Sequence, residues 1–144
     1  MEAKAFRALS ERLTTALVTG DFELYRQVVG LPVRFEPREG KAYTLETVDE
    51  LQEDFALYHD MMSLHGITDI YREILGIEQP EPQRADVTCL VNYLRKTGRA
   101  VDPFRMKMTL REGGDGWRIH LIKSSLGHIN WTLGKGGIED GSFV

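Results

Sequence analysis

The first third of the chain places apolar side chains three and four positions apart, which is the spacing of one face of a helix. This spacing predicts a first helix that ends at Gly20 and a short second helix that Asp21 caps. Residues 33–45 are expected to form a short extended hairpin that turns at Glu39–Gly40. The apolar faces of the two helices are Phe6, Leu9, Leu13 and Leu17, and then Phe22, Tyr25, Val28 and Val29.

A third helix is predicted between Thr47 and Gly66. Thr47 and Glu50 match a capping box, in which each side chain accepts a hydrogen bond from the other residue's backbone N–H. Gly66 is suited to end the helix. The apolar face of this helix is Val48, Leu51, Phe55, Tyr58 and Met62.

After Gly66 the apolar period changes to two, which predicts strands. We expect strands at residues 67–79, 84–94, 101–111 and 117–124, because each break between them consists of turn-forming residues. The order of elements predicts an α+β domain over residues 1–125, in which N-terminal helices pack in a long, curved antiparallel sheet. The glycine-rich residues 126–144 are expected to form an irregular tail, with Ile129 and Trp131 as candidate anchors.

This element order resembles the nuclear transport factor 2-like superfamily, which includes ketosteroid isomerase-like and polyketide cyclase-like proteins. The resemblance covers about residues 3–125 and also rests on Gly20–Asp21 between the first helices and on Gly116–Trp117–Arg118–Ile119 in the final strand. It implies a cystatin-like cone with an internal pocket, and often a dimer through the sheet. It implies no single activity, because the superfamily contains both enzymes and non-enzymes.

Matching the apolar faces of neighbouring strands predicts their register. Val91 is placed opposite Phe104, and Leu110 opposite Trp117, which makes one face almost wholly apolar. That face must cover the helices, and Cys89 would be a buried, unreactive thiol on it. We expect the other face to mediate a homodimer, because two apolar side chains are exposed on it among polar ones. This outer face would carry Thr88, Leu90, Asn92, Arg105, Lys107, Thr109, Arg118, His120 and Ile122.

The same register gathers polar side chains at one end of the inner face, with Tyr93 opposite Asp102 and Lys123 opposite Phe104. Such a cluster at the mouth of an apolar cone suits a small-ligand site. The alternative interpretation is a solvent-exposed rim, at which these polar side chains simply reach water. A bulge at Pro103 would turn Asp102 outward.

The first strand of the sheet can face in two ways. One facing points Asp69 and Tyr71 inward and enriches the polar end of the cone. The other points Ile70, Arg72 and Ile74 inward and is the more apolar of the two. The periodicity does not decide between them.

His59 lies one residue beyond Tyr58 on the third helix, where it is either a pocket base near neutral pH or a boundary histidine with one nitrogen in water. Two functions remain open: a binding domain for an apolar ligand with one polar end, or a cofactor-free isomerase, dehydratase or cyclase acting on a small carbonyl compound. The candidate catalytic residues are Asp102, Tyr93 and His59, and the candidate ligand-binding residues are Tyr58, Met62, Tyr71, Phe104, Met106, Met108, Trp117 and Lys123.

Composition excludes several other classes of function. The net charge of −4 gives no basic footprint for nucleic acid, and no apolar run approaches the roughly 20 residues that span a bilayer. One cysteine cannot form an internal disulfide, and its presence is typical of a reducing compartment. The spacing of histidines and cysteines matches no metal site, and no nucleophile elbow or phosphate loop is present. We therefore expect a cytoplasmic protein that uses no metal and no cofactor.

Overall fold

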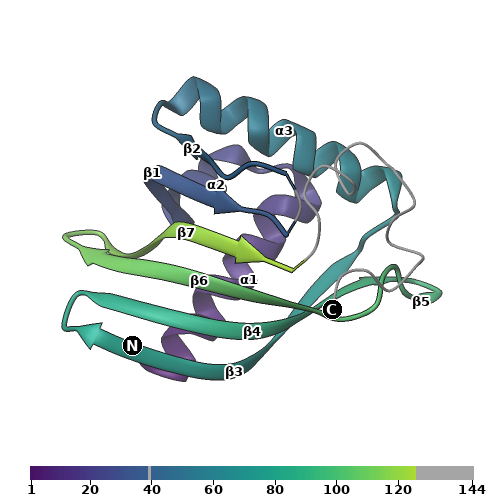
Figure 1. The fold of residues 1–144 in the computed structure, drawn as a ribbon. Helices are drawn as coiled ribbons and strands as arrows, with labels where there is room; N and C mark the ends of the chain where they lie inside the picture. The colour runs from purple at the N-terminus through teal and green to yellow at the C-terminus, as the bar shows by residue number, and fades with distance from the viewer. Residues whose placement is uncertain (39, 126–144) are drawn as a thin grey trace.

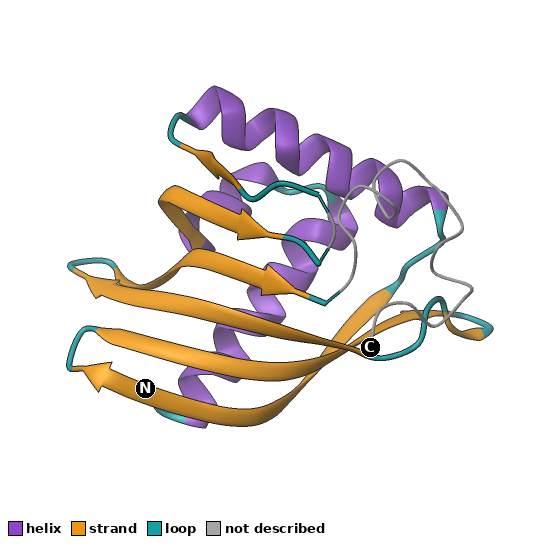
Figure 2. Cartoon of the chain, in the orientation of Figure 1, coloured by secondary structure: helices purple, strands orange, loops and turns teal. Residues whose placement is uncertain are grey.

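The computed structural model describes residues 1–38 and 40–125, and Figure 1 shows their helices packed against a strongly curved sheet. Figure 2 shows that the helices gather on one side of that sheet. The helices of the described part are α1 (Ala3–Thr19), α2 (Phe22–Val28) and α3 (Val48–Leu64). Its strands are β1 (Val29–Glu36), β2 (Tyr43–Leu45), β3 (Asp69–Glu81), β4 (Arg84–Arg95), β5 (Gly98–Arg99), β6 (Phe104–Gly113) and β7 (Gly116–Ser124).

The predicted helix signals are confirmed at the end of α1 and the start of α2, but α2 ends at Val28, and Val29, which was predicted on the helix, begins β1. Gly20 ends α1 in the left-handed conformation at φ 77°, which a residue without a β-carbon adopts readily. The Asp21 side chain then caps α2 by accepting a hydrogen bond from the Leu24 backbone at 3.1 Å. The buried face of α1 is Phe6, Leu9, Leu13, Ala16 and Leu17.

The capping box that begins α3 is also present. Thr47 Oγ1 accepts from the Glu50 N–H at 3.2 Å, and the Glu50 carboxylate accepts from the Thr47 N–H at 3.1 Å. The helix buries Leu51, Phe55 and Met62 against the rest of the core. Figure 1 shows α3 alongside the β2–β1 edge of the sheet.

The sheet has the strand order β2-β1-β7-β6-β4-β3, and β5 adds a short hairpin to β4. Its neighbouring strands run antiparallel except for β1 and β7, which are parallel. The sheet is therefore mixed and not purely antiparallel as predicted. Alternating apolar residues reveal a strand and its buried face, but they do not reveal its partner or its direction.

The predicted register is confirmed for one hairpin and wrong for the next. Val91 lies opposite Phe104 between β4 and β6, as expected from face matching. Between β6 and β7, however, Leu110 pairs with Ile119, and a bulge follows. The hairpin stays paired up to its tight glycine turn, so the register differs by two residues at the start of β7.

The bulge in β7 reverses the faces of the residues that follow it. His120 is the unpaired extra residue, and its Nδ1 lies 2.9 Å from the carbonyl oxygen of Pro32. Beyond it, Ile122 faces inward opposite Met108, whereas the prediction placed Ile122 outside. Lys123 pairs with Lys107 on the outer face, so its predicted inward position is wrong.

The first long strand, β3, takes the more apolar of its two possible facings. Ile70 and Arg72 are buried at 5% and 7% exposure, and Tyr71 is 58% exposed. The buried guanidinium Nη1 of Arg72 donates to the Ser10 carbonyl at 3.1 Å and to Thr14 Oγ1 at 2.7 Å. These charge-assisted bonds join β3 to α1 and stabilise the positive charge of Arg72 on the inner face of the sheet.

Two further findings concern the described residues alone. No helix among residues 1–38 and 40–125 is long and apolar enough to cross a membrane. No group of three or more histidine, cysteine, aspartate or glutamate side chains in those residues could hold a metal ion. The predicted tail, with Ile129 and Trp131, lies outside the described residues.

Candidate functional site

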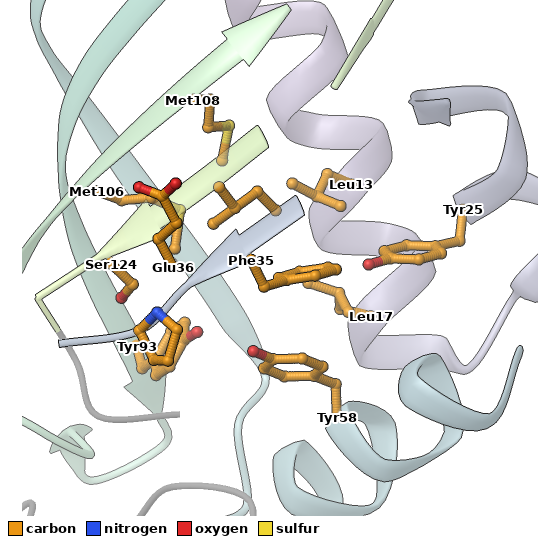
Figure 3. Close-up of a pocket in the computed structure, with 12 residues that line it drawn as sticks. Leu13, Leu17, Tyr25, Phe35, Glu36, Tyr58, Tyr93, Met106, Met108 and Ser124 are labelled. Atoms are coloured by element: carbon orange, nitrogen blue, oxygen red, sulfur yellow. The ribbon is translucent and has the colours of Figure 1, made fainter. Parts of the chain in front are cut away.

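A cavity lies between the helices and the inner face of the sheet (Figure 3). The volume open to the centres of water-sized molecules is about 60 Å³, so the cavity has room for several waters or a small ligand. Every layer of the fold contributes to its wall. The lining residues are Leu13, Leu17, Tyr25, Phe35, Glu36, Pro37, Tyr58, Tyr93, Met106, Met108, Ile122 and Ser124.

Most of the wall is apolar and follows from the periodicity of its elements. Leu13 and Leu17 lie one turn apart on the buried face of α1. Met106 and Met108 alternate on the inner face of β6, with Ile122 beside Met108 on β7. Methionine side chains are unbranched and polarisable, so this part of the wall adapts to ligands of different shape.

Tyrosine hydroxyls supply the polar groups on the helical side. Figure 3 shows the Tyr25 and Tyr58 hydroxyls directed from α2 and α3 toward the sheet side of the cavity, with Phe35 among them. Burial raises the pKa of Tyr93 to about 12, and it raises the pKa of Tyr25 and Tyr58 above the usual range as well. All of these hydroxyls therefore keep their protons at physiological pH.

Tyr25 differs from the other two tyrosines. Its side chain is only 2% exposed, and its ring packs against Phe55 in a tilted arrangement at a centroid distance of 4.6 Å. No hydrogen bond joins its hydroxyl to another residue within the described part of the chain, and the hydroxyl is directed into the cavity. A hydroxyl that opens on a cavity and is not bonded to the protein wall is suited to a group that enters the cavity.

Tyr58 connects the cavity to a carboxyl group behind it. The Tyr43 hydroxyl donates to Asp54 Oδ1 at 3.1 Å, and a second side-chain hydrogen bond joins Tyr43 to Tyr58. Burial raises the pKa of Asp54 to about 6, although the bond from Tyr43 opposes that shift. A group that exchanges its proton near neutral pH is therefore linked through two hydroxyls to the cavity wall.

Glu36 contributes a carboxylate to the wall itself, at the end of β1. Its Oε2 accepts from Arg34 Nε at 2.9 Å, so the charge has a partner two residues away on the same strand. Neither Asp54 nor Glu36 was among the residues predicted from the sequence.

The structure brings together four of the predicted site residues in the cavity wall. These are Tyr58, Tyr93, Met106 and Met108. Two others, Met62 and Phe104, are core residues at 1% exposure, and Phe104 supports Tyr93 through an edge-on ring contact at 5.1 Å. Trp117 pairs with Glu112 next to the β6–β7 turn and does not line the cavity.

The remaining predicted residues lie elsewhere. His59 Nδ1 is 2.8 Å from the carbonyl oxygen of Leu17, so the ring caps the end of α1 as a boundary histidine. Asp102 is exposed in the segment between β5 and β6, outside the strand pairing that would have placed it opposite Tyr93. Tyr71 and Lys123 are exposed on the outer face. The predicted Tyr–Asp–Lys cluster is therefore not formed.

Comparisons with known proteins show which fold the chain adopts. No family model and no curated protein matches the sequence. A nuclear transport factor 2-like protein of unknown function from Shewanella oneidensis MR-1 matches with a TM-score of 0.66 and 16% identity, over 85% of this chain and 98% of that one. The chain has the nuclear transport factor 2-like fold.

Other solved structures with this fold agree. A cystatin-like domain of unknown function from Nostoc punctiforme PCC 73102 matches with a TM-score of 0.63 and 17% identity, over 83% of this chain and 74% of that one. A protein provisionally named a ketosteroid isomerase, from Shewanella frigidimarina NCIMB 400, matches with a TM-score of 0.60 and 17% identity, over 81% of this chain and 90% of that one. At such identities the nuclear transport factor 2-like fold carries no activity with it.

Proposed function

We propose that the cavity binds a small, mostly apolar molecule whose polar end accepts a hydrogen bond from Tyr25. The observation that carries the proposal is the Tyr25 hydroxyl, which points into the cavity and has no hydrogen-bond partner in the described part of the chain. Because the pKa of this tyrosine is raised, the hydroxyl is a donor, and an oxygen acceptor such as a carbonyl suits it.

The apolar wall supports the same proposal. Leu13, Leu17, Met106, Met108 and Ile122 would contact the body of the ligand, and ligand sites of this kind combine mostly apolar walls with a few placed polar groups. Each buried CH₂ group of the ligand would contribute about 0.8 kcal/mol to binding.

The test compares Tyr25→Phe with the wild-type chain against a panel of small ketones and hydrocarbons of matched shape. Loss of one neutral hydrogen bond is worth about 1 kcal/mol, so ketone affinity should fall roughly fivefold while hydrocarbon affinity stays the same. Tyr71→Phe is the matched control, because it removes the hydroxyl of a tyrosine that is 58% exposed on the outer face. Calorimetry and thermal shift both report the change. Equal affinity of every ketone for Tyr25→Phe and wild type contradicts the proposal.

An enzyme acting on a carbonyl compound is the second candidate, and the Asp54–Tyr43–Tyr58 chain favours it. In that reaction Glu36 takes a proton from the α-carbon of a β,γ-unsaturated ketone, forming a dienolate, and returns that proton to the γ-carbon, which gives the conjugated ketone. Tyr58 donates a hydrogen bond to the enolate oxygen when Asp54 is protonated, because Asp54 then donates to Tyr43 and Tyr43 to Tyr58, which leaves the Tyr58 proton for the ligand.

Deuterium uptake from D₂O into a bound ketone, followed by NMR, separates the two candidates. Turnover requires uptake that depends on enzyme concentration and is lost in Glu36→Gln. If a ketone binds but exchanges its protons no faster than in buffer, the binding function is retained and this isomerase chemistry is excluded.

A further inference from the structure

The hydrogen-bonded chain of Asp54, Tyr43 and Tyr58 has a direction. The Tyr43 hydroxyl donates to Asp54 Oδ1 at 3.1 Å, and Tyr43 also forms a side-chain hydrogen bond with Tyr58. A phenolic hydroxyl carries one proton, so each tyrosine donates to one partner at a time. Tyr58 is the member of the chain that lines the cavity.

The charge of Asp54 sets that direction. Burial raises the pKa of Asp54 to about 6, so at about pH 8 the carboxyl is ionised and only accepts hydrogen bonds. The one Tyr43 proton is then directed to Asp54, which makes Tyr58 the donor in the bond between the two tyrosines. With its proton used in this way, Tyr58 faces the cavity as a hydrogen-bond acceptor.

Tyr25 offers the opposite property. Its hydroxyl is directed into the cavity and makes no hydrogen bond in the described part of the chain, so its proton is free to bind a ligand. Figure 3 shows the Tyr25 and Tyr58 hydroxyls entering the cavity from α2 and α3. The helical side of the cavity therefore presents a donor and an acceptor.

We infer that the polar end of the ligand carries a hydrogen-bond acceptor next to a donor, as a primary amide, an undissociated carboxylic acid or an α-hydroxy ketone does. The inference rests on the proposed function and adds a second contact to it. The ligand oxygen accepts from Tyr25, and the adjacent N–H or O–H group donates to the Tyr58 oxygen. A ligand without that donor leaves the Tyr58 oxygen against an apolar atom in a mostly apolar cavity, which weakens binding.

The experiment uses three probes of one shape. Benzamide, acetophenone and nitrobenzene share a ring and one acceptor oxygen, and they place NH₂, CH₃ and a second oxygen at the neighbouring position. All three remain uncharged throughout the pH range used, and calorimetry or NMR titration measures their affinity for the full chain. The variants are Tyr58→Phe and Tyr43→Phe, with Tyr71→Phe on the outer face as the matched control. Circular dichroism and thermal unfolding verify that each variant is folded.

Each substitution should change the ranking of the probes at about pH 8. Tyr58→Phe should lower benzamide affinity roughly fivefold, whereas acetophenone affinity should not fall. Tyr43→Phe releases the Tyr58 proton, so nitrobenzene should gain roughly fivefold relative to benzamide. Tyr71→Phe should change neither ratio. A purely structural effect of a substitution would alter all three affinities by the same factor.

The pH dependence supplies an independent measurement. When Asp54 is protonated it donates to Tyr43, Tyr43 donates to Tyr58, and the Tyr58 proton is released to the ligand. Asp54 interacts with the titratable groups of Tyr43 on β2, Tyr58 on α3 and Tyr25 on α2, and burial keeps all three protonated.

Nitrobenzene should therefore gain roughly fivefold relative to benzamide in the wild type between about pH 8 and pH 5, and Tyr43→Phe should show no such change. A contribution from Glu36, whose carboxylate lies in the cavity wall, would persist in Tyr43→Phe.

Other outcomes overturn the inference and are distinguishable from failure of the proposed function. If Tyr58→Phe weakens the three probes equally, or leaves benzamide unchanged, the ligand does not donate to Tyr58. If neither Tyr43→Phe nor the change of pH alters the ratio of nitrobenzene to benzamide affinity, Asp54 does not direct the chain. In both cases the proposed function stands as long as Tyr25→Phe weakens ketone binding. If no probe and no ketone binds, the proposed function fails together with the inference.

Discussion

Asp54→Asn removes a carboxyl group whose ionisation is unfavourable in the folded protein. Burial raises the pKa of Asp54 from 3.8 to about 6. A difference of roughly two units, at about 1.4 kcal/mol per unit, makes the ionised group destabilising by roughly 3 kcal/mol. The neighbouring Tyr43 and Tyr58 stay neutral in this pH range, because burial raises the pKa of each.

The sign of the pH dependence follows from the direction of this shift. The folded state holds the Asp54 proton more tightly than the unfolded chain does, so its stabilising effect is complete below about pH 4 and is lost as the pH rises through about 6. The asparagine variant carries no such proton. Relative to wild type it should therefore become more stable, by up to about 3 kcal/mol, as the pH rises from about 4 to 8.

Urea unfolding of both proteins across this range measures the effect as a difference in the free energy of unfolding. Subtracting the free energy of unfolding of one protein from that of the other removes the contribution of every titratable group that the two proteins share. Asp60→Asn is the control, because it changes the same charge at an exposed position of the same helix. A wild-type minus Asp54→Asn difference that stays constant with pH would refute the assignment of a raised pKa to this carboxyl.

Three further predictions concern the scaffold. Gly20→Ala should lower stability by about 1–2 kcal/mol in thermal unfolding, because φ is +77° and the new β-carbon would lie 2.7 Å from His59 Nε2; an unchanged melting temperature contradicts this. Thr47→Ala should cost about 1 kcal/mol in urea unfolding by removing the capping box, and an unchanged unfolding midpoint contradicts this. Light scattering should give twice the chain mass of 16.4 kDa, and Leu90→Glu on the outer face should give the monomer, whereas a wild-type monomer at high concentration would exclude the homodimer.

Local patterns predicted the helices and the long strands, and face matching predicted correctly one of the two strand registers to which it was applied. The β4–β6 register was obtained by placing Val91 opposite Phe104, because a one-residue shift would turn the apolar side chains of one strand outward. The β6–β7 register does not follow in this way, since Leu110 finds an apolar partner in either Trp117 or Ile119. A bulge such as the one at His120 adds a residue without changing the composition of the strand, so periodicity alone does not reveal it.

The same limit explains which site residues could be predicted. Met106 and Met108 were predicted because they belong to the face fixed by the correct register. Phe35 was missed because β1 joins the cavity wall through its pairing with β7, and no local pattern encodes a contact over that distance. Tyr25, which lies on α2, was missed as well. Tyr25 did have a signal, since it falls on the apolar face of its helix and carries a hydroxyl that burial must satisfy.

The parallel pair of β1 and β7 has a consequence for how the chain folds. Val29 and Ile119 are paired although 90 positions separate them, so the loop between them must close before that contact forms. The hairpin of β1 and β2 has no other strand neighbour in the described sheet, and it must wait for residues 116–124. Folding should therefore be slow for a chain of this size, with the edge of β1 exposed to mispairing until β7 arrives. During synthesis, β1 cannot pair with β7 until residues 116–124 have left the ribosome.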